Sequence, residues 1–382
     1  MTAETPTSEK QGIETLVSER YAEGAQARQE ALCCPVDYDT SLLKMLPQEI
    51  IERDYGCGDP SRYVREGDVV LDLGSGGGKI CYMAAQIVGS EGAVIGVDMT
   101  DEMLSLARSY KGEMAEKLGN DRVEFKKGFI QDLALNVESM EAFLAENPVT
   151  DINSLQQLEQ WKANQKSQQP LIEDNSVSLV VSNCVLNLVA QSDRSQMLRE
   201  VFRVLKPGGR VAISDIVCDE LVPEHLQKDA HLWSGCISGA FQEKEFIQAF
   251  LDAGFVGVAY DKWESEPWQV VEGIEFRSVT LVATKPAKTD LYDAGQAILY
   301  RGPFSKVEDD LGNHFTRGDR IAVSKRTYNL LTQGEYADHF IGMSPDSDIN
   351  NGCFCKPAGS LRPASETKGG QHAGGNESSG CC

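Results

Sequence analysis

The chain has 382 residues, 41% of them hydrophobic, and this length allows one large domain and a small second one. The formal net charge of −22 argues against a nucleic-acid substrate, because phosphate binding needs a basic surface. No apolar run reaches the length of a membrane span and residues 1–10 are polar, so we expect a cytoplasmic protein without a membrane or nucleic-acid partner.

The cysteine content is unusual for such a protein. Eleven cysteines would indicate a disulfide framework in a small secreted domain, but this chain is too large for that class. Metal-like binding or redox chemistry is the better interpretation. The five histidines are scattered and form no Cys/His zinc pattern, so the sequence predicts soft thiolate ligation without imidazole.

The N-terminal part, residues 1–40, is predicted to be a helical segment that carries the adjacent thiols Cys33 and Cys34. Pro35 disfavours helix at the residue before it, so the helix should end there. The next thiol, Cys57, lies between two glycines. That setting predicts an exposed thiol in a flexible loop.

A glycine-rich turn follows. Residues 69–73 are an apolar, partly β-branched run, which predicts a buried parallel strand. The loop 74–78 and a helix over 80–88 come next, and a strand, a glycine turn and a helix N-terminus together form a nucleotide-type pocket. Asp98 ends a second strand, 93–97, about 20 residues past the loop, where a ribose needs a carboxylate acceptor. Both a dinucleotide and S-adenosylmethionine fit this spacing.

Two features favour S-adenosylmethionine. Asp72 stands just before the first glycine, where it can hold an amino-acid moiety. Farther on, a turn leads into a late strand over 210–216 and reads Lys206-Pro207-Gly208-Gly209. This turn is similar to that of class I S-adenosylmethionine-dependent methyltransferases. The alternative is a glycine turn that binds nothing.

The remaining pattern completes the fold prediction. Alternation of strands and helices predicts an α/β fold with a doubly wound, seven-stranded Rossmann-like sheet of the class I methyltransferase type. The predicted strands are 69–73, 93–97, 123–129, 177–182, 210–216, 256–262 and 278–285.

Four parts of the chain are expected. After the N-terminal segment, the methyltransferase domain spans 41–287 and includes a polar, Gln-rich insertion at about 136–170, which we interpret as a surface excursion. A small mixed domain follows at 288–345. Residues 346–382 are rich in Gly, Ser, Asn and Pro and are predicted to be a disordered, Cys-containing tail.

Three thiols are expected to converge. Ligands of α/β sheets bind at the carboxyl ends of the strands, and Cys184 ends the strand 177–182. Cys236 lies in a segment after the strand 210–216 that can cover the same face, and Cys57 lies in the loop before the first strand. The sequence therefore predicts sulfur ligands above the cofactor.

At this point the chain resembles the arsenite S-adenosylmethionine methyltransferases over residues 30–345. The resemblance rests on the following runs: Tyr55-Gly56-Cys57-Gly58, Leu71-Asp72-Leu73-Gly74-Ser75-Gly76-Gly77-Gly78, Gly96-Val97-Asp98-Met99-Thr100, Ser182-Asn183-Cys184-Val185-Leu186-Asn187-Leu188 and Gly235-Cys236-Ile237-Ser238-Gly239-Ala240.

The resemblance implies an activity and an arsenic site. Cys184 and Cys236 match the arsenic-binding pair, and Cys57 matches a third thiol that either binds arsenic or forms a disulfide with an upstream thiol, Cys34 or Cys33. The implied enzyme is a monomer that methylates arsenite to methylarsenite and then to dimethylarsenite. It would take As(III)–thiol complexes as substrate and a glutathione- or thioredoxin-type thiol reductant as co-substrate.

The resemblance also implies a cofactor site for S-adenosylmethionine. Members of the family often have Glu where this chain has Gln131, but an amide oxygen can still accept a hydrogen bond from the adenine amine. The implied cofactor residues are Tyr55, Asp72, Gly74, Ser75, Gly76, Asp98, Met99, Ile130, Gln131 and Asn183.

Two alternatives stay open at the level of sequence. One is a methyltransferase for an organic or other chalcogen substrate, with structural cysteines. The other is a non-catalytic, thiol-rich metalloid-binding protein, against which the intact glycine loop argues. Cys81 and Cys218 are expected to be core residues, whereas the thiols of the tail have either a role in handling metalloids or none.

Overall fold

The structure is a computed structural model, which describes residues 19–26, 36–229, 232–233, 235–287, 291–333, 336–345 and 349–367. The chain divides into two compact units, Met1–Lys285 and Pro286–Cys382. Cys33 and Cys34 lie outside the described residues, as does the end of the predicted tail. In the part of the chain that is described, no helix has the length and apolar character needed to cross a membrane.

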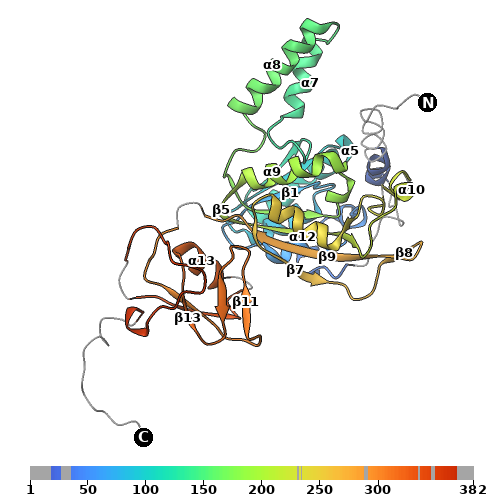
Figure 1. The fold of residues 1–382 in the computed structure, drawn as a ribbon. Helices are drawn as coiled ribbons and strands as arrows, with labels where there is room; N and C mark the ends of the chain where they lie inside the picture. The colour runs from blue at the N-terminus through green and yellow to red at the C-terminus, as the bar shows by residue number, and fades with distance from the viewer. Residues whose placement is uncertain are drawn as a thin grey trace, which may run out of the picture. The chain divides into compact units, whose positions relative to one another are not determined.

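The larger unit is built on a doubly wound sheet, as predicted (Figure 1). Its main path runs β3-β2-β1-β4-β5-β9-β7. The first five of these strands are parallel, whereas β9 is antiparallel to both of its neighbours. The bounds are β1 Val69–Leu73, β2 Ala93–Asp98, β3 Val123–Lys127, β4 Val177–Asn183, β5 Leu205–Cys218, β7 Val256–Trp263 and β9 Ile274–Thr284, with the short strands β6 Phe241–Gln242 beside β5 and β8 Gln269–Val271 beside β9.

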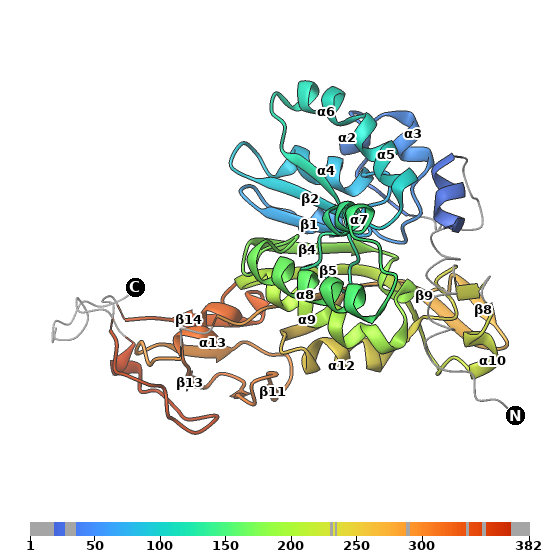
Figure 2. The ribbon, with the colours of Figure 1, turned by 90° about the horizontal axis from the view of Figure 1, so that it is seen from above.

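Helices cover both faces of this sheet (Figures 1 and 2). Alternate residues of a strand point to opposite faces, and β1 shows this directly: Val70 packs in the core under α4, α5 and α6, whereas Leu71 and Leu73 pack in the core under α9 and α12. The bounds are α4 Lys79–Ile87, α5 Asp101–Ser109, α6 Lys111–Leu118, α9 Arg194–Val204 and α12 Glu243–Asp252, with shorter helices α2 Thr40–Leu43, α3 Gln48–Glu52 and α10 Glu224–Gln227.

The strand order places the ligand site. The chain winds outward from β1 in both directions, so the order reverses between β1 and β4. In open α/β sheets a crevice opens at such a point, outside the carboxyl ends of the strands. The residues that follow β1 and β4, which include the glycine-rich loop and Cys184, are therefore brought to one place.

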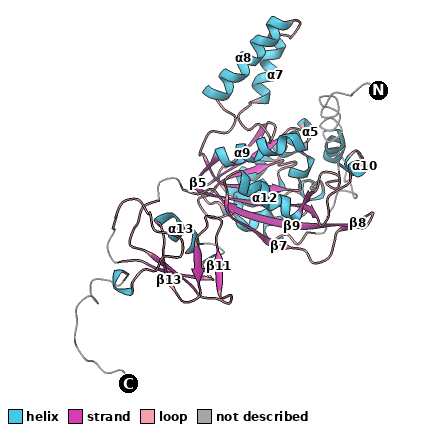
Figure 3. Cartoon of the chain, in the orientation of Figure 1, coloured by secondary structure: helices cyan, strands magenta, loops and turns pink. Residues whose placement is uncertain are grey.

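The polar insertion at 136–170 contains two helices, α7 Val137–Glu146 and α8 Ile152–Gln168, which project from the sheet (Figure 3). The rings of Phe143 and Trp161 stack between them at 4.9 Å, and Lys166 pairs with Asp132 at the base. None of the residues of α8 is buried. The hairpin is therefore held mainly by its own contacts and by ion pairs.

The smaller unit has its own core. A three-stranded sheet, β13-β10-β14, and a two-stranded sheet, β11-β12, enclose the buried side chains of Ile298, Phe315 and Ile321. The bounds are β10 Ala297–Tyr300, β11 Lys306–Glu308, β12 His314–Thr316, β13 Arg320–Ala322, α13 Lys325–Leu331 and β14 Phe340–Met343.

The structure differs from the prediction of a disordered tail over residues 349–367, which pack in the smaller unit. Leu361 bridges to Ile321, and the buried guanidinium of Arg362 donates to Asp293 at 2.6 Å. Composition misleads here because this segment extends an existing sheet, and backbone pairing does not depend on apolar side chains.

Candidate active site

A pocket opens at the carboxyl ends of β1 and β4. All ten residues that the resemblance assigns to the cofactor line it: Tyr55, Asp72, Gly74, Ser75, Gly76, Asp98, Met99, Ile130, Gln131 and Asn183. Cys184 lines the same pocket. Direct contact of these residues with a cofactor stays a prediction.

The glycine-rich loop follows the wall of this pocket closely. Gly74 has a φ of +68°, and a Cβ at this position would lie 2.5 Å from Cγ1 of Val185. Gly76 has a φ of +50° and donates its N–H to Oδ2 of Asp98 at 2.8 Å. Only glycine adopts such positive φ values at little cost, so the loop can hold this shape and stay narrow.

Three polar groups line the pocket, and within the described residues none of them forms an ion pair with a basic side chain. Burial raises the pKa of Asp72 to about 8, and its carboxylate accepts a hydrogen bond from Sγ of Cys81 at 3.3 Å. Burial also raises the pKa of Asp98. The hydroxyl of Ser75 is buried and has no hydrogen-bond partner within the described residues. Buried polar groups of this kind are normally satisfied, so they suit a ligand with a cation and several hydroxyl groups.

The three predicted thiols come together beside this pocket. Cys57 and Cys184 form a disulfide across 127 residues of sequence, with their Cα atoms 5.8 Å apart. Sγ of Cys236 donates to the backbone oxygen of Cys184 at 3.3 Å. Cys184, Cys236 and Asp215 each offer one ligand atom, and these atoms lie within 4.8 Å of one another.

The prediction that Cys57 is an exposed, flexible thiol is wrong, because its exposed fraction is 1%. The flanking glycines serve close packing instead. A Cβ at Gly56 would lie 1.9 Å from Nδ2 of Asn183, and one at Gly58 would lie 2.3 Å from Oγ of Ser214. The disulfide partner also differs from the upstream thiol that the resemblance implies.

Asn183 holds the loop of Cys57 with both ends of its amide. Oδ1 accepts the N–H groups of Cys57 at 2.9 Å and Gly58 at 3.0 Å, and Nδ2 donates to the oxygen of Gly58 at 2.8 Å. The hydroxyl of Ser278 donates to the oxygen of Cys57 at 2.6 Å. These contacts give Asn183 a role in placing a thiol, which the resemblance does not imply.

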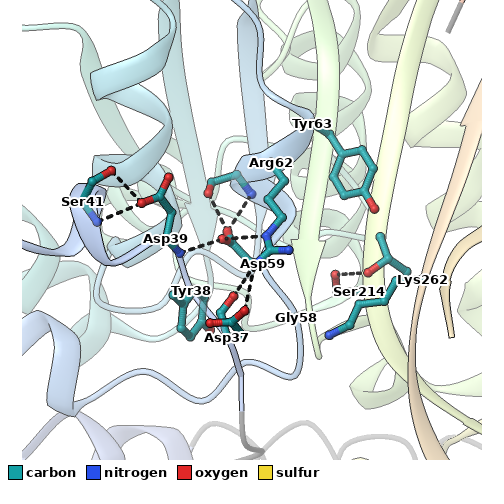
Figure 4. A network of polar contacts seen from close by, with 12 residues as sticks. Asp37, Tyr38, Asp39, Ser41, Gly58, Asp59, Arg62, Tyr63, Ser214 and Lys262 are labelled. Atoms are coloured by element: carbon teal, nitrogen blue, oxygen red, sulfur yellow. Dashed lines mark hydrogen bonds and ion pairs between the residues drawn. The ribbon is translucent and has the colours of Figure 1, made fainter. Parts of the chain in front are cut away.

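Asp59 fixes the same loop two residues later (Figure 4). Its carboxylate accepts the N–H of Asp39 at 3.3 Å, the N–H of Ser61 at 3.1 Å and Nε of Arg62 at 3.4 Å. Asn183 therefore fixes the loop to the end of β4, and Asp59 fixes it to the segment before α2.

Arg194 joins the segment of Cys236 to the segment that follows Cys184. Its buried guanidinium donates to the backbone oxygens of Gly239 and of Val189, the latter at 3.3 Å. The same group lies 4.0 Å above the ring of Phe241. A Cβ at Gly239 would lie 2.0 Å from the oxygen of Asn187, so only glycine permits this approach.

Asp215 is the acidic member of the thiol cluster. Asp215 is fully buried in β5. Its carboxylate accepts hydrogen bonds from the N–H of Leu186 at 2.9 Å and from Nδ2 of Asn187 at 2.8 Å. Burial raises the pKa of Asp215 to about 7. The sequence reasoning missed both Asp215 and Arg194. The available signal was an acid inside the apolar run of a central strand, where a carboxylate needs a local reason to be buried.

Two of the site cysteines have an unusual backbone. Within the described residues, four non-glycine residues have a positive φ, and Cys184 at 61° and Cys236 at 63° are two of them. Such a conformation costs roughly 1–3 kcal/mol for each residue and persists only where the surroundings impose it. Hydrogen bonds from Cys184 N to Ser214 O at 2.8 Å and from Cys236 N to Trp233 O at 3.0 Å help to impose it.

The helical segment 19–26 adds a tyrosine that the sequence reasoning also missed. Tyr21 lines the pocket, meets the ring of Tyr55 edge-on at 6.1 Å and packs against the apolar cluster that contains the three thiols. Burial, and then the nearby thiol of Cys236, raise the pKa of Tyr21. The phenol therefore lies between the pocket and the thiols.

Comparison with known proteins gives two matching family models. A methyltransferase domain matches residues 65–167 and 156–254, and a domain of unknown function matches residues 287–372. The second match includes the segment 349–367, which packs in the smaller unit.

Several similar proteins are arsenite methyltransferases. That of Aquipseudomonas alcaligenes is 31% identical over 316 residues, which cover 78% of this chain and 80% of the relative. That of Mus musculus is 29% identical over 343 residues, or 87% and 80%. The crystal structure of CrArsM, an arsenic(III) S-adenosylmethionine methyltransferase from Chlamydomonas reinhardtii, matches with a TM-score of 0.55 and 27% identity over 86% of this chain and 100% of that chain.

Proposed function

This chain belongs to the arsenite methyltransferase family, and we propose that it methylates trivalent arsenic held by the thiolates of Cys57, Cys184 and Cys236. One observation carries the proposal: three thiols from three distant segments meet beside the pocket that the predicted cofactor residues line. Arsenic(III) is soft and prefers thiolate sulfur to oxygen or imidazole ligands.

The residues of the pocket fit S-adenosylmethionine. Asp72 suits the ammonium of the amino-acid moiety, Asp98 suits the ribose hydroxyls, and the unsatisfied hydroxyl of Ser75 offers a further polar contact. Ile130 and Gln131 are assigned to the adenine. When bound, the cofactor supplies a methyl group attached to a positively charged sulfur.

The thiols bind and orient the arsenic. A thiol reductant of the glutathione or thioredoxin type first converts the Cys57–Cys184 disulfide into two thiols and is itself oxidised to a disulfide. Arsenous acid then exchanges its three hydroxides for three thiolates, and each hydroxide leaves as water with the proton of a thiol. The lone pair stays on arsenic, so this nucleophile needs no general base.

The electron balance of the reaction gives the disulfide a role in the catalytic cycle, which is to return arsenic to the trivalent state. Arsenic would donate its lone pair to the methyl group, the bond between that methyl group and the cofactor's sulfur would break to leave a neutral thioether, and arsenic would thereby be oxidised from As(III) to As(V). Two thiolates that leave arsenic as a disulfide return two electrons and restore As(III). The pairing of Cys57 with Cys184 supports these two thiols in that role. In methylarsenite the methyl group occupies one of the three positions on arsenic, so two positions remain for thiolates. A second round of methylation yields dimethylarsenite.

Placement of the reactants is the main contribution of the protein. Holding a nucleophile and a methyl donor in line within one site lowers the barrier by several kcal/mol, up to about 10 kcal/mol in well-oriented cases. Tyr21 and Tyr55 line the pocket beside the thiols, and their rings meet edge-on there.

The test is arsenic speciation over time, with the purified chain, arsenite, a thiol reductant and S-adenosylmethionine labelled in its methyl group. Methylarsenite should appear first and dimethylarsenite later. Cys184→Ser and Cys236→Ser should abolish both steps, whereas Cys57→Ser should spare the second step more than the first. A chain that binds the cofactor but forms no methylated arsenic would overturn the proposal.

A further inference from the structure

Two cysteines of the smaller unit take no part in the site described above. Cys353 and Cys355 lie in the segment 349–367, are both exposed and are both free thiols. Exposed free thiols are a liability because they oxidise and exchange with other disulfides. A pair at this spacing therefore calls for a chemical explanation.

The backbone holds these two residues in an extended strand-like segment. Cys353 bridges to Tyr292, and hydrogen bonds join Asp293 N to Gly352 O and Phe354 N to Leu291 O, each at 2.9 Å. Residues two apart in an extended segment point to the same side, so both thiols face one way. Phe354 between them is partly buried, which agrees with this alternation.

The thiol of Cys353 also affects the pKa of Cys355. A hydrogen bond with Cys353 is the main cause that raises the pKa of Cys355 above its usual value. Both thiols therefore lie on one exposed side of the same extended segment. The pair forms a dithiol whose shape exists before any ligand binds.

The number of thiols selects among thiol-binding ligands. A divalent cation such as Zn²⁺ is usually held by three or four protein ligands, so two thiols alone bind it weakly. Arsenous acid brings its own hydroxides, which accept the protons: As(OH)₃ and two thiols give a dithiolate As–OH complex and two waters. No electron is transferred and no net charge develops.

We propose that Cys353 and Cys355 form a second, surface site that binds trivalent arsenicals as a two-thiolate complex, separate from the thiols that hold arsenic for methylation. The choice of arsenic as ligand rests on the proposed function, whereas the dithiol itself does not. Two thiolates leave one position on arsenic open, so a bound arsenical stays exchangeable.

The test uses phenylarsine oxide, which has room for two thiols and releases one water on binding them. The parent chain carries Ser in place of Cys33, Cys34, Cys57, Cys184, Cys236, Cys381 and Cys382, and is kept under a thiol-free reductant. We expect about one arsenic per chain after desalting, measured by elemental mass spectrometry. Adding Cys353→Ser or Cys355→Ser should lower this value to near zero.

Two outcomes would overturn the proposal: a parent chain that retains no arsenic, or uptake that survives Cys353→Ser. Far-UV circular dichroism of each variant checks the fold, and both positions are exposed, so serine should be tolerated. Equal uptake after preincubation with Zn²⁺ is expected, whereas full protection by Zn²⁺ would overturn the preference for arsenic.

The native chain separates this inference from the proposed function. Cys353→Ser with Cys355→Ser should leave the maximal rate of arsenite methylation unchanged, because neither residue belongs to the methyl-transfer site. If the native chain methylates no arsenic while the parent still binds phenylarsine oxide, the proposed function fails and the dithiol site stands. If the native chain methylates arsenic but the parent chain binds no phenylarsine oxide, the proposed function stands and the dithiol site fails.

Discussion

At the scale of single residues, the site depends on side chains that position a thiol or a ligand. Cys184 and Cys236 adopt positive φ values that few residues other than glycine tolerate, and their N–H groups donate to the backbone oxygens of Ser214 in β5 and of Trp233, which stabilises them. Asn183 and Arg194 both hold backbone groups of the segments that carry the thiols. The arrangement of sulfur is therefore set by residues that carry no sulfur.

Asn183 gives the sharpest test of this positioning. Asn183→Ala removes two acceptor contacts and a donor contact to the loop of Cys57, at about 1 kcal/mol for each buried hydrogen bond. At a fixed ratio of reduced to oxidised glutathione, the fraction of chains with the Cys57–Cys184 disulfide should fall severalfold, measured by thiol alkylation and mass spectrometry.

Asn183→Asp is the matched control for that experiment. It keeps an oxygen that accepts from the N–H groups of Cys57 and Gly58 but loses the donor to Gly58, so the disulfide fraction should lie between those of the wild type and Asn183→Ala. Equal disulfide fractions in all three chains would show that Asn183 does not position Cys57.

We predict that Asp72 makes cofactor binding depend on pH. Burial raises its pKa to about 8, and an ammonium group binds the ionised form, so binding below that pH must release a proton. Between about pH 6 and about pH 7.5 the affinity for S-adenosylmethionine should therefore rise with pH, by up to about tenfold per pH unit. Calorimetry in buffers of different ionisation enthalpy measures both the affinity and the proton release.

Asp72→Asn should bind the cofactor more weakly and without this pH dependence. The range stops near pH 7.5 because an α-amino group itself loses its proton at about pH 8. A wild-type affinity that stays constant over the same range would rule out an ionised Asp72 as the partner of the ammonium.

At the scale of elements, the segments of Cys184 and Cys236 meet through a contact that only glycine allows. Gly239→Ala would place a Cβ 2.0 Å from the oxygen of Asn187 and 3.2 Å from Nη2 of Arg194. Overpacking of this kind costs about 1–3 kcal/mol. The arsenite concentration needed for half-maximal rate should rise about tenfold or more, whereas the affinity for S-adenosylmethionine should not change.

Gly112→Ala serves as the matched glycine control. Gly112 lies within α6, and a Cβ there would meet no atom within 4 Å. Alanine should stabilise the chain by about 1 kcal/mol through helix propensity, seen as a higher denaturation midpoint at unchanged activity. A loss of arsenite affinity in this variant as well would show that the effect of Gly239→Ala is not local.

At the scale of the whole molecule, two units with separate cores should unfold separately. Phe315 is fully buried in the smaller unit and Phe250 is fully buried in the larger one. Each change to alanine costs roughly 3–5 kcal/mol, so Phe315→Ala and Phe250→Ala should each lower a different calorimetric transition.

Adding the cofactor should show which unit gives rise to which calorimetric transition. A ligand raises the stability only of the unit that binds it, so S-adenosylmethionine should raise the transition that Phe250→Ala lowers and leave the other unchanged. A single transition shifted by both variants would show that the units unfold as one.

Much of the fold and of the pocket lining could be predicted from local sequence patterns. Short apolar runs, glycine turns and their spacing predicted the doubly wound sheet, and the family motifs named ten residues that line one pocket. These features are readable because strand period and glycine conformation depend on neighbours in the chain. The rule that strand ends meet at one edge placed Cys184 beside the cofactor, and the expected approach of Cys57 and Cys236 rested on their flanking segments.

Only the tertiary structure decided how the thiols are placed. The disulfide of Cys57 with Cys184 joins residues more than 120 positions apart, and so do the contacts of Asn183 with the loop of Cys57. No local sequence pattern encodes such pairings or the burial of Cys57 that results from them. The same holds for Tyr21 beside the pocket and for the segment 349–367, whose composition indicates disorder although backbone pairing and the buried Arg362–Asp293 ion pair order it. The sequence determined which residues are available for chemistry, and long-range packing decided which of them meet.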